Sequence, residues 1–160
     1  MKRLIAILLG VVLTLLLAPA ASADKPVREF LPAQDFTLTG VCSFPVREEV
    51  TTNNGFITTF TDGRQLVTGS LKVRATNLDS GKALDLNISG PGVITENSDG
   101  SVTLDAHGSW LIWFFPGDLG PGSPGQLFVN SGHFVETFSS TGVTVDQQTG
   151  SQQDICAALA

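Results

Sequence analysis

The feature that most constrains the fold is a repeated pattern of short alternating segments separated by turn dipeptides. From residue 35 onward, apolar and polar residues alternate in short runs that recur about every 8 to 12 residues. The turn signals between the runs are Asn54-Gly55, Asp62-Gly63, Asp79-Ser80-Gly81, Asp99-Gly100, Ser131-Gly132, Thr141-Gly142 and Thr149-Gly150. Asn-Gly and Asp-Gly supply the positive φ angles of tight hairpins. The pattern predicts an all-β domain of antiparallel strands in meander order.

The expected strands follow from this alternation. Leu71, Val73 and Ala75 alternate with polar neighbours, which places them on the core side of a sheet. The predicted strands cover residues 44–52, 56–61, 65–68, 71–76, 84–89, 102–107, 110–115, 126–130, 133–138 and 143–146. An apolar period of 3.6 residues is missing before the last ten residues, so we expect helix only near 154–159.

A set of nine to ten short strands must protect its edges, and closure of the sheet does so most completely. We therefore expect the antiparallel meander to close as a small β-barrel. A two-sheet β-sandwich is the alternative, because alternation defines the buried face and not the closure.

The N-terminus predicts export. Lys2 and Arg3 precede an apolar run from Leu4 to Leu17, and Ala21-Ser22-Ala23 follows, which is the order of a secretory signal peptide. We expect a signal peptide over 1–23, an N-terminal lead-in over 24–34 and a single β domain over 35–160. A second long apolar segment is missing, so the cleaved product is expected to be extracellular, without a transmembrane segment.

Two cysteines, Cys42 and Cys156, are expected to form a disulfide, because an exported chain meets an oxidising environment. Removing Lys2 and Arg3 leaves 7 basic against 15 acidic residues, a net charge near −8. Nucleic acid is therefore an unexpected partner, since its binding requires a basic surface.

The two histidines, His107 and His133, are the first candidates for catalysis or metal binding. His107 falls on the polar side of its strand, before an expected turn at Gly108, and is interpreted as a solvent-facing residue. Neither histidine shows a spaced carboxylate partner in the sequence. We therefore predict no metal site and no cofactor.

Glu136 is in phase with Phe134 and Phe138. Either two phenylalanines face solvent or a carboxylate faces the interior, where its pKa would rise and it could act as an acid, a base or a ligand anchor. A β-bulge or an edge position that lets Glu136 reach water is the favoured interpretation.

The longest apolar run outside the N-terminal segment is 110–115, and both of its alternating faces are apolar. Such a strand is either buried on both sides or exposes an aromatic patch that could bind an apolar ligand, a membrane or another subunit. A glycine-rich loop at 117–125 follows and could gate a cavity. The candidate ligand-binding residues are Trp110, Trp113, Phe115 and Glu136.

Several motifs together resemble a family of small secreted actinobacterial proteins: Cys42-Ser43-Phe44-Pro45-Val46, Asp62-Gly63-Arg64, the segments 76–82 and 88–92, and Asp154-Ile155-Cys156-Ala157-Ala158-Leu159. The resemblance covers most of the chain after the signal peptide. These are turn and disulfide motifs, so the resemblance implies an exported all-β protein and assigns no catalytic residue.

The leading functional hypothesis is a secreted, disulfide-closed, non-enzymatic β domain that binds a small apolar ligand or a partner surface through residues 110–115 and the adjoining glycine loop. One alternative is a small barrel enzyme of the cyclase or isomerase type, with Glu136 inside and His133 nearby. Another is a structural protein of the cell envelope. The sequence does not indicate an oligomeric state.

Overall fold

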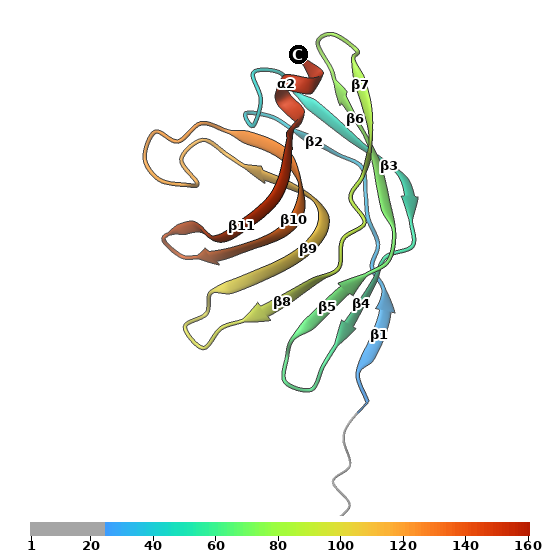
Figure 1. Ribbon diagram of the computed structural model, residues 1–160, viewed down its shortest axis with the longest axis vertical. Coiled ribbons are helices and arrows are strands. Elements are labelled where there is room, and N and C mark those ends of the chain that lie inside the picture. The colour runs from blue at the N-terminus through green and yellow to red at the C-terminus, as the bar shows by residue number, and fades with distance from the viewer. Residues whose placement is uncertain (1–24) are drawn as a thin grey trace, which may run out of the picture.

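The computed structural model describes residues 25–160, so the expected signal peptide at 1–23 lies outside the described residues. The described chain forms eleven antiparallel strands in two sheets (Figure 1). In order, the larger sheet contains β1 (Val27–Phe30), β4 (Phe56–Thr59), β5 (Gln65–Thr68), β8 (Gly92–Glu96), β9 (Val102–Phe114), β10 (Gln126–Ser139) and β11 (Gly142–Asp154). The smaller sheet contains β2 (Phe36–Leu38), β3 (Val46–Asn53), β6 (Leu71–Asn77) and β7 (Ala83–Asn87). The all-β prediction is confirmed.

The expected closed barrel is not found within residues 25–160, where the strand order of neither sheet returns to its first strand. The chain instead crosses between the sheets four times, at residues 31–35, 54–55, 69–70 and 88–91. Adjacent crossings are joined by backbone hydrogen bonds, such as the one from Asn54 N to Ser70 O (2.8 Å). These crossings divide the early strands between two sheets, so the two-sheet alternative describes the observed strand order.

Four of the predicted turn signals join paired strands as expected. Asp62-Gly63 joins β4 to β5, Asp79-Ser80-Gly81 joins β6 to β7, Asp99-Gly100 joins β8 to β9, and Thr141-Gly142 joins β10 to β11. Asn54-Gly55 is different: it lies at a crossing between sheets, where β3 and β4 do not pair with each other.

The predicted turns at Ser131-Gly132 and Thr149-Gly150 are wrong, because both lie inside long strands. Gly108, Gly132 and Gly150 are cross-strand neighbours in β9, β10 and β11, and we call them the glycine row. A Cβ atom at Gly132 would lie 2.1 Å from the carbonyl oxygen of Thr149. Glycine inside a strand marks a sharp bend or a close backbone approach. Figure 1 shows β9, β10 and β11 curving together. β9 and β10 are each one continuous strand where two were expected, and β11 extends well beyond the strand expected at 143–146.

The segment at 24–34, expected as a lead-in, contains β1, which pairs with β4 at the edge of the larger sheet. At the other end of the chain, the expected short helix is α2 (Ile155–Leu159). The Asp154 carboxylate caps it by accepting a hydrogen bond from Ala157 N (2.9 Å), since the first amides of a helix have no partners within it. Among residues 25–160, no helix has the length and hydropathy needed to cross a membrane.

The core has two parts. The first joins the smaller sheet to α2 and to β9 and β10, and includes Val46, Val73, Leu111, Val129 and Ile155. The predicted Cys42–Cys156 disulfide is present and fastens α2 beside this cluster, with the two Cα atoms 5.4 Å apart. The second part lies on β9 and β10 and consists of Ala106, Ile112, Phe114, Phe128 and Phe134.

Candidate functional site

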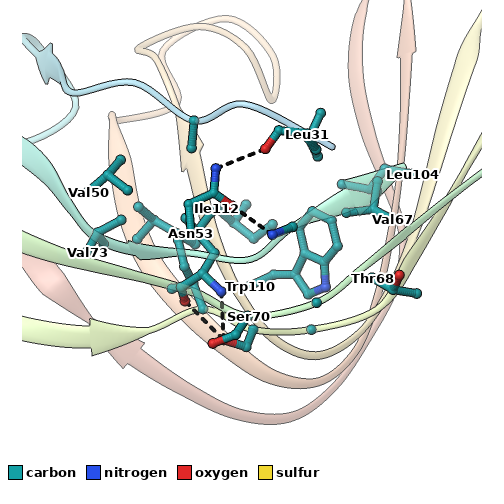
Figure 2. Close-up of a pocket in the computed structure, with 18 of the residues that line it drawn as sticks. Leu31, Val50, Asn53, Val67, Thr68, Ser70, Val73, Leu104, Trp110 and Ile112 are labelled. Atoms are coloured by element: carbon teal, nitrogen blue, oxygen red, sulfur yellow. Dashed lines mark hydrogen bonds between the residues drawn. The ribbon is translucent and has the colours of Figure 1, made fainter. Parts of the chain in front are cut away.

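A cavity of about 510 Å³ is lined by residues from both sheets. Val50 and Val73 come from the smaller sheet, Val67 and Leu104 from the larger one, and Leu31 from the crossing between β1 and β2 (Figure 2). The lining is predominantly aliphatic and aromatic. Clefts of this size and character are the usual sites for small molecules in proteins.

Trp110 lies in this lining because two glycines at the start of the adjacent strand, Gly90 just before β8 and Gly92 in β8, leave room for its indole. A Cβ atom would lie 2.4 Å from the indole ring at Gly90 and 2.5 Å from it at Gly92. The indole N–H donates a hydrogen bond to the carbonyl oxygen of Pro91 (3.2 Å). The ring is therefore fixed in orientation, with its polar atom satisfied and its apolar surface available to the cavity (Figure 2).

Trp113 also lines the cavity but remains 41% exposed. Its ring centroid lies 5.7 Å from that of Phe36, which is likewise a lining residue and 37% exposed. Two neighbouring aromatic side chains that contact both the cavity and solvent mark an opening of the cavity. Phe115, the next candidate, follows the last residue of β9; it is 42% exposed but does not line the cavity.

The run 110–115 is therefore buried in part on both of its faces. Leu111 belongs to the first core cluster, whereas Ile112 and Phe114 belong to the second. The glycine-rich loop at 117–125, expected beside the site, contributes no lining residue to the cavity. Its backbone instead turns on itself, with Gly117 N donating to Ser123 O (3.0 Å), and it meets the β10–β11 hairpin through a bond from Val143 N to Asp118 O (3.3 Å).

Glu136 is only 4% exposed and lines the cavity. Burial raises the pKa of its carboxyl group from 4.5 to about 7, because the ionised form loses its hydration. The favoured interpretation, in which a bulge brings Glu136 to water, is wrong. A register shift is present between Val135 and Glu136, but the residue that it leaves unpaired is Asp146 on β11, which accepts a hydrogen bond from the Thr137 hydroxyl (2.6 Å).

Several other polar side chains of the lining already have partners. The Asn53 amide donates to Leu31 O (2.9 Å) and accepts from Gly55 N (2.8 Å), and the Ser89 hydroxyl donates to Leu71 O (3.0 Å). These bonds hold the crossings that surround the cavity. The Glu136 carboxyl, by contrast, owes its raised pKa to burial alone, without a neighbouring charge or hydrogen bond contributing. It is therefore the group in the lining best suited to recognise a polar atom of a ligand.

The histidines lie on the opposite face of β9 and β10 from this cavity. His107 and His133 are directly paired across the strands, and their rings stack with centroids 4.2 Å apart and planes at 9°. Asp105 Oδ1 lies 2.8 Å from His133 Nε2 and 3.1 Å from His107 Nε2. His107 is exposed as expected, but the premise that the histidines lack a carboxylate partner is wrong, because Asp105 lies two residues before His107 on β9 and contacts both rings.

The strand geometry also separates Glu136 from His133, the two residues on which the alternative of a barrel enzyme depends. Glu136 and His133 have opposite phases on β10, so their side chains lie on opposite faces of the strand. Glu136 is buried toward the cavity, and His133 contacts Asp105 on the other face. The structure therefore does not assemble Glu136 and His133 into an acid–base pair.

A second buried carboxyl group, that of Glu48, was not among the candidates that the sequence analysis identified. Glu48 lies in β3, is 1% exposed, and neither of its carboxylate oxygens has a hydrogen-bond partner among residues 25–160. Burial raises its pKa from 4.5 to about 7. The signal was present, because Glu48 alternates in phase with Val46 and Val50, both of which belong to the core face.

The described chain is thus a two-sheet, disulfide-linked β protein with an apolar cavity that contains one carboxyl group. Comparison with protein-family models, with curated protein sequences and with solved structures finds no match. The resemblance to small secreted actinobacterial proteins remains a prediction.

Proposed function

We propose that this protein binds a small apolar molecule in the cavity between its sheets, and that Glu136 recognises a polar atom of that molecule. The observation that supports this function is the combination of a cavity of about 510 Å³, an apolar lining and one carboxyl group inside it. Binding releases water from apolar surface, which provides the favourable free energy, while the carboxyl group provides orientation.

The chemistry of Glu136 defines the ligand class further. With a pKa of about 7, the carboxyl group is largely protonated in mildly acidic solution and donates a hydrogen bond. A carbonyl or ether oxygen on a hydrocarbon or ring body is the matching partner. Above pH 7 the ionised carboxylate can no longer donate, and a neutral ligand of this class loses that bond.

Export forms part of the proposal. It is supported by the signal-peptide pattern at 1–23 and by the Cys42–Cys156 disulfide, which is compatible with an extracellular protein. Sequencing the N-terminus of protein collected from the medium of an expressing culture tests it. A mature N-terminus at Asp24 is the expected result, and a protein that keeps residues 1–23 inside the cell contradicts it.

The binding test is a titration with N-phenyl-1-naphthylamine, a neutral apolar fluorophore, followed by the rise in its emission and by quenching of the tryptophans. Saturable binding is expected, with displacement by long-chain ketones. Trp113→Ala, at the opening, should weaken binding at least tenfold. Phe115→Ala is the matched control, since it removes an equally exposed aromatic that follows the end of β9 and lies outside the cavity. Absence of saturable binding, or equal losses in both variants, refutes the proposal.

The role of Glu136 has a separate readout. In the wild-type protein, the affinity for a neutral ketone should fall as the pH rises from 6 to 8, because the donated hydrogen bond is lost. Glu136→Gln keeps a donor at every pH and should remove this dependence. A Glu136→Gln variant that binds the ketone with the wild-type pH profile would show that the carboxyl group takes no part in recognition.

A further inference from the structure

We propose that Asp105, His107 and His133 form a zinc-binding site on the face of β9 and β10 opposite the cavity. The three side chains present one carboxylate oxygen and two imidazole nitrogens whose candidate ligand atoms all lie within 4.8 Å of one another. Carboxylate oxygen and imidazole nitrogen are ordinary ligands of Zn²⁺. This site is independent of the proposed ligand cavity.

The spacing of the donor atoms is close to the spacing that zinc requires. Bonds of about 2.0–2.1 Å in tetrahedral geometry separate the ligand atoms by about 3.3 Å. Asp105 Oδ1 lies 2.8 Å from one Nε2 atom and 3.1 Å from the other. The two separations from Asp105 Oδ1 must therefore widen by a few tenths of an ångström, and the two stacked rings must turn so that both Nε2 lone pairs converge on the ion.

The strands hold the donors together. His107 and His133 are direct cross-strand partners, and Asp105 lies two residues from His107, so that alternation places it on the same face of β9. The central position of β9 between β8 and β10 restricts movement of this ladder. A binding constellation carried on paired strands is more accurately positioned than one carried on loops.

The exposure of the three side chains also allows an ion to reach the site. The side chains of His107, Asp105 and His133 are 56%, 46% and 26% exposed, so zinc can enter and complete its coordination with water. Without metal, His133 Nε2 and Asp105 Oδ1 share a hydrogen bond, and zinc bound to both atoms would replace it.

The test is calorimetric titration of the purified, tag-free protein with zinc chloride. One equivalent is expected to bind, and His107→Ala, His133→Ala and Asp105→Asn should each weaken binding at least tenfold. Asp79→Asn is the control, because it removes an exposed carboxylate from the turn between β6 and β7, which belong to the smaller sheet. Circular dichroism and thermal unfolding establish that each variant is folded.

Imidazole NMR gives an independent readout, because the chain contains only two histidines. Both rings should shift together and reach saturation at one equivalent of zinc. The proposal is overturned if no zinc binds at about 1 mM, if His133→Ala binds zinc as tightly as wild type, or if only one ring responds. Binding that persists in both histidine variants would instead identify adventitious carboxylate binding.

Discussion

Replacing Glu48 with glutamine should change how the stability of the protein depends on pH. The Glu48 carboxyl is 1% exposed, and neither oxygen has a partner within the described chain, so its ionised form is strongly disfavoured in the folded state. Its pKa is about 7 when folded and 4.5 when exposed by unfolding. Between these values the folded protein holds a proton that the unfolded chain has released.

The sign and size follow from this difference. Because the folded state binds more protons in this window, the stabilisation is complete below pH 4.5 and is lost as the pH rises through 7. Each pKa unit corresponds to about 1.4 kcal/mol, so the complete effect is about 3 kcal/mol, of which about 2.5 kcal/mol falls between pH 5 and pH 8. Glutamine is neutral at both pH values and does not show this loss.

The assay is urea unfolding followed by tryptophan fluorescence at pH 5 and pH 8. Glu48→Gln should raise stability by less than about 1 kcal/mol at pH 5 and by about 3 kcal/mol at pH 8. Glu49→Gln, at the exposed neighbouring position, is the matched control and should follow the wild-type protein. If Glu48→Gln and wild type lose equal stability between the two pH values, the assignment of Glu48 as a buried, unpaired carboxyl is wrong.

Two further changes test the architecture itself. Gly132→Ala places a Cβ atom 2.1 Å from Thr149 O and should destabilise the protein by roughly 2 to 3 kcal/mol in urea unfolding. Gly100→Ala, where a Cβ atom meets open space but φ is +81°, should cost only about 1 to 2 kcal/mol, and equal losses would argue against the close approach in the glycine row. The double variant Cys42→Ser/Cys156→Ser opens a loop of 114 residues and should lose about 4 to 5 kcal/mol by the loop-entropy model, whereas a loss below 1 kcal/mol would show that the unfolded chain gains little freedom.

The sequence was sufficient wherever a local pattern determines the structure. Alternation predicted β6 from Leu71, Val73 and Ala75, and Asp62-Gly63 predicted the turn between β4 and β5. Cysteine number predicted the disulfide, because two cysteines allow one pairing. Each of these predictions needs only neighbouring residues or an arithmetic constraint.

Predictions failed where the sequence around a glycine fits both a tight turn and the interior of a long strand. Thr149-Gly150 satisfies the composition of a turn, but Gly150 pairs with Gly132 inside two long strands. The reason for glycine there is the backbone of the adjacent strand, which no local pattern contains. The positions at which the chain crosses between the sheets also depend on contacts between distant segments. For that reason the sequence could not decide between a barrel and two sheets.

The candidate sites could be recognised only once the packing of the sheets and the pairing of the strands were known. Trp110 and Glu136 were candidates from their types and phases, but the cavity that they share depends on side chains from both sheets. Asp105 and His107 are near each other in sequence, whereas His133 joins them only through the register of β9 and β10. The packing of the two sheets was the missing information for the cavity, and cross-strand register was the missing information for the histidines.

The disulfide gives the covalent chain a ring that contains nearly the whole domain, from Cys42 to Cys156. A protease that hydrolyses one peptide bond anywhere inside this ring produces no separate fragments. The two halves remain one molecule, heavier by one water, and the paired strands can hold the cut ends in place. Only a second cut, or reduction of the sulfur–sulfur bond, releases a piece, so this single crosslink makes the domain tolerant of an isolated nick in any hairpin that lies between the two cysteines.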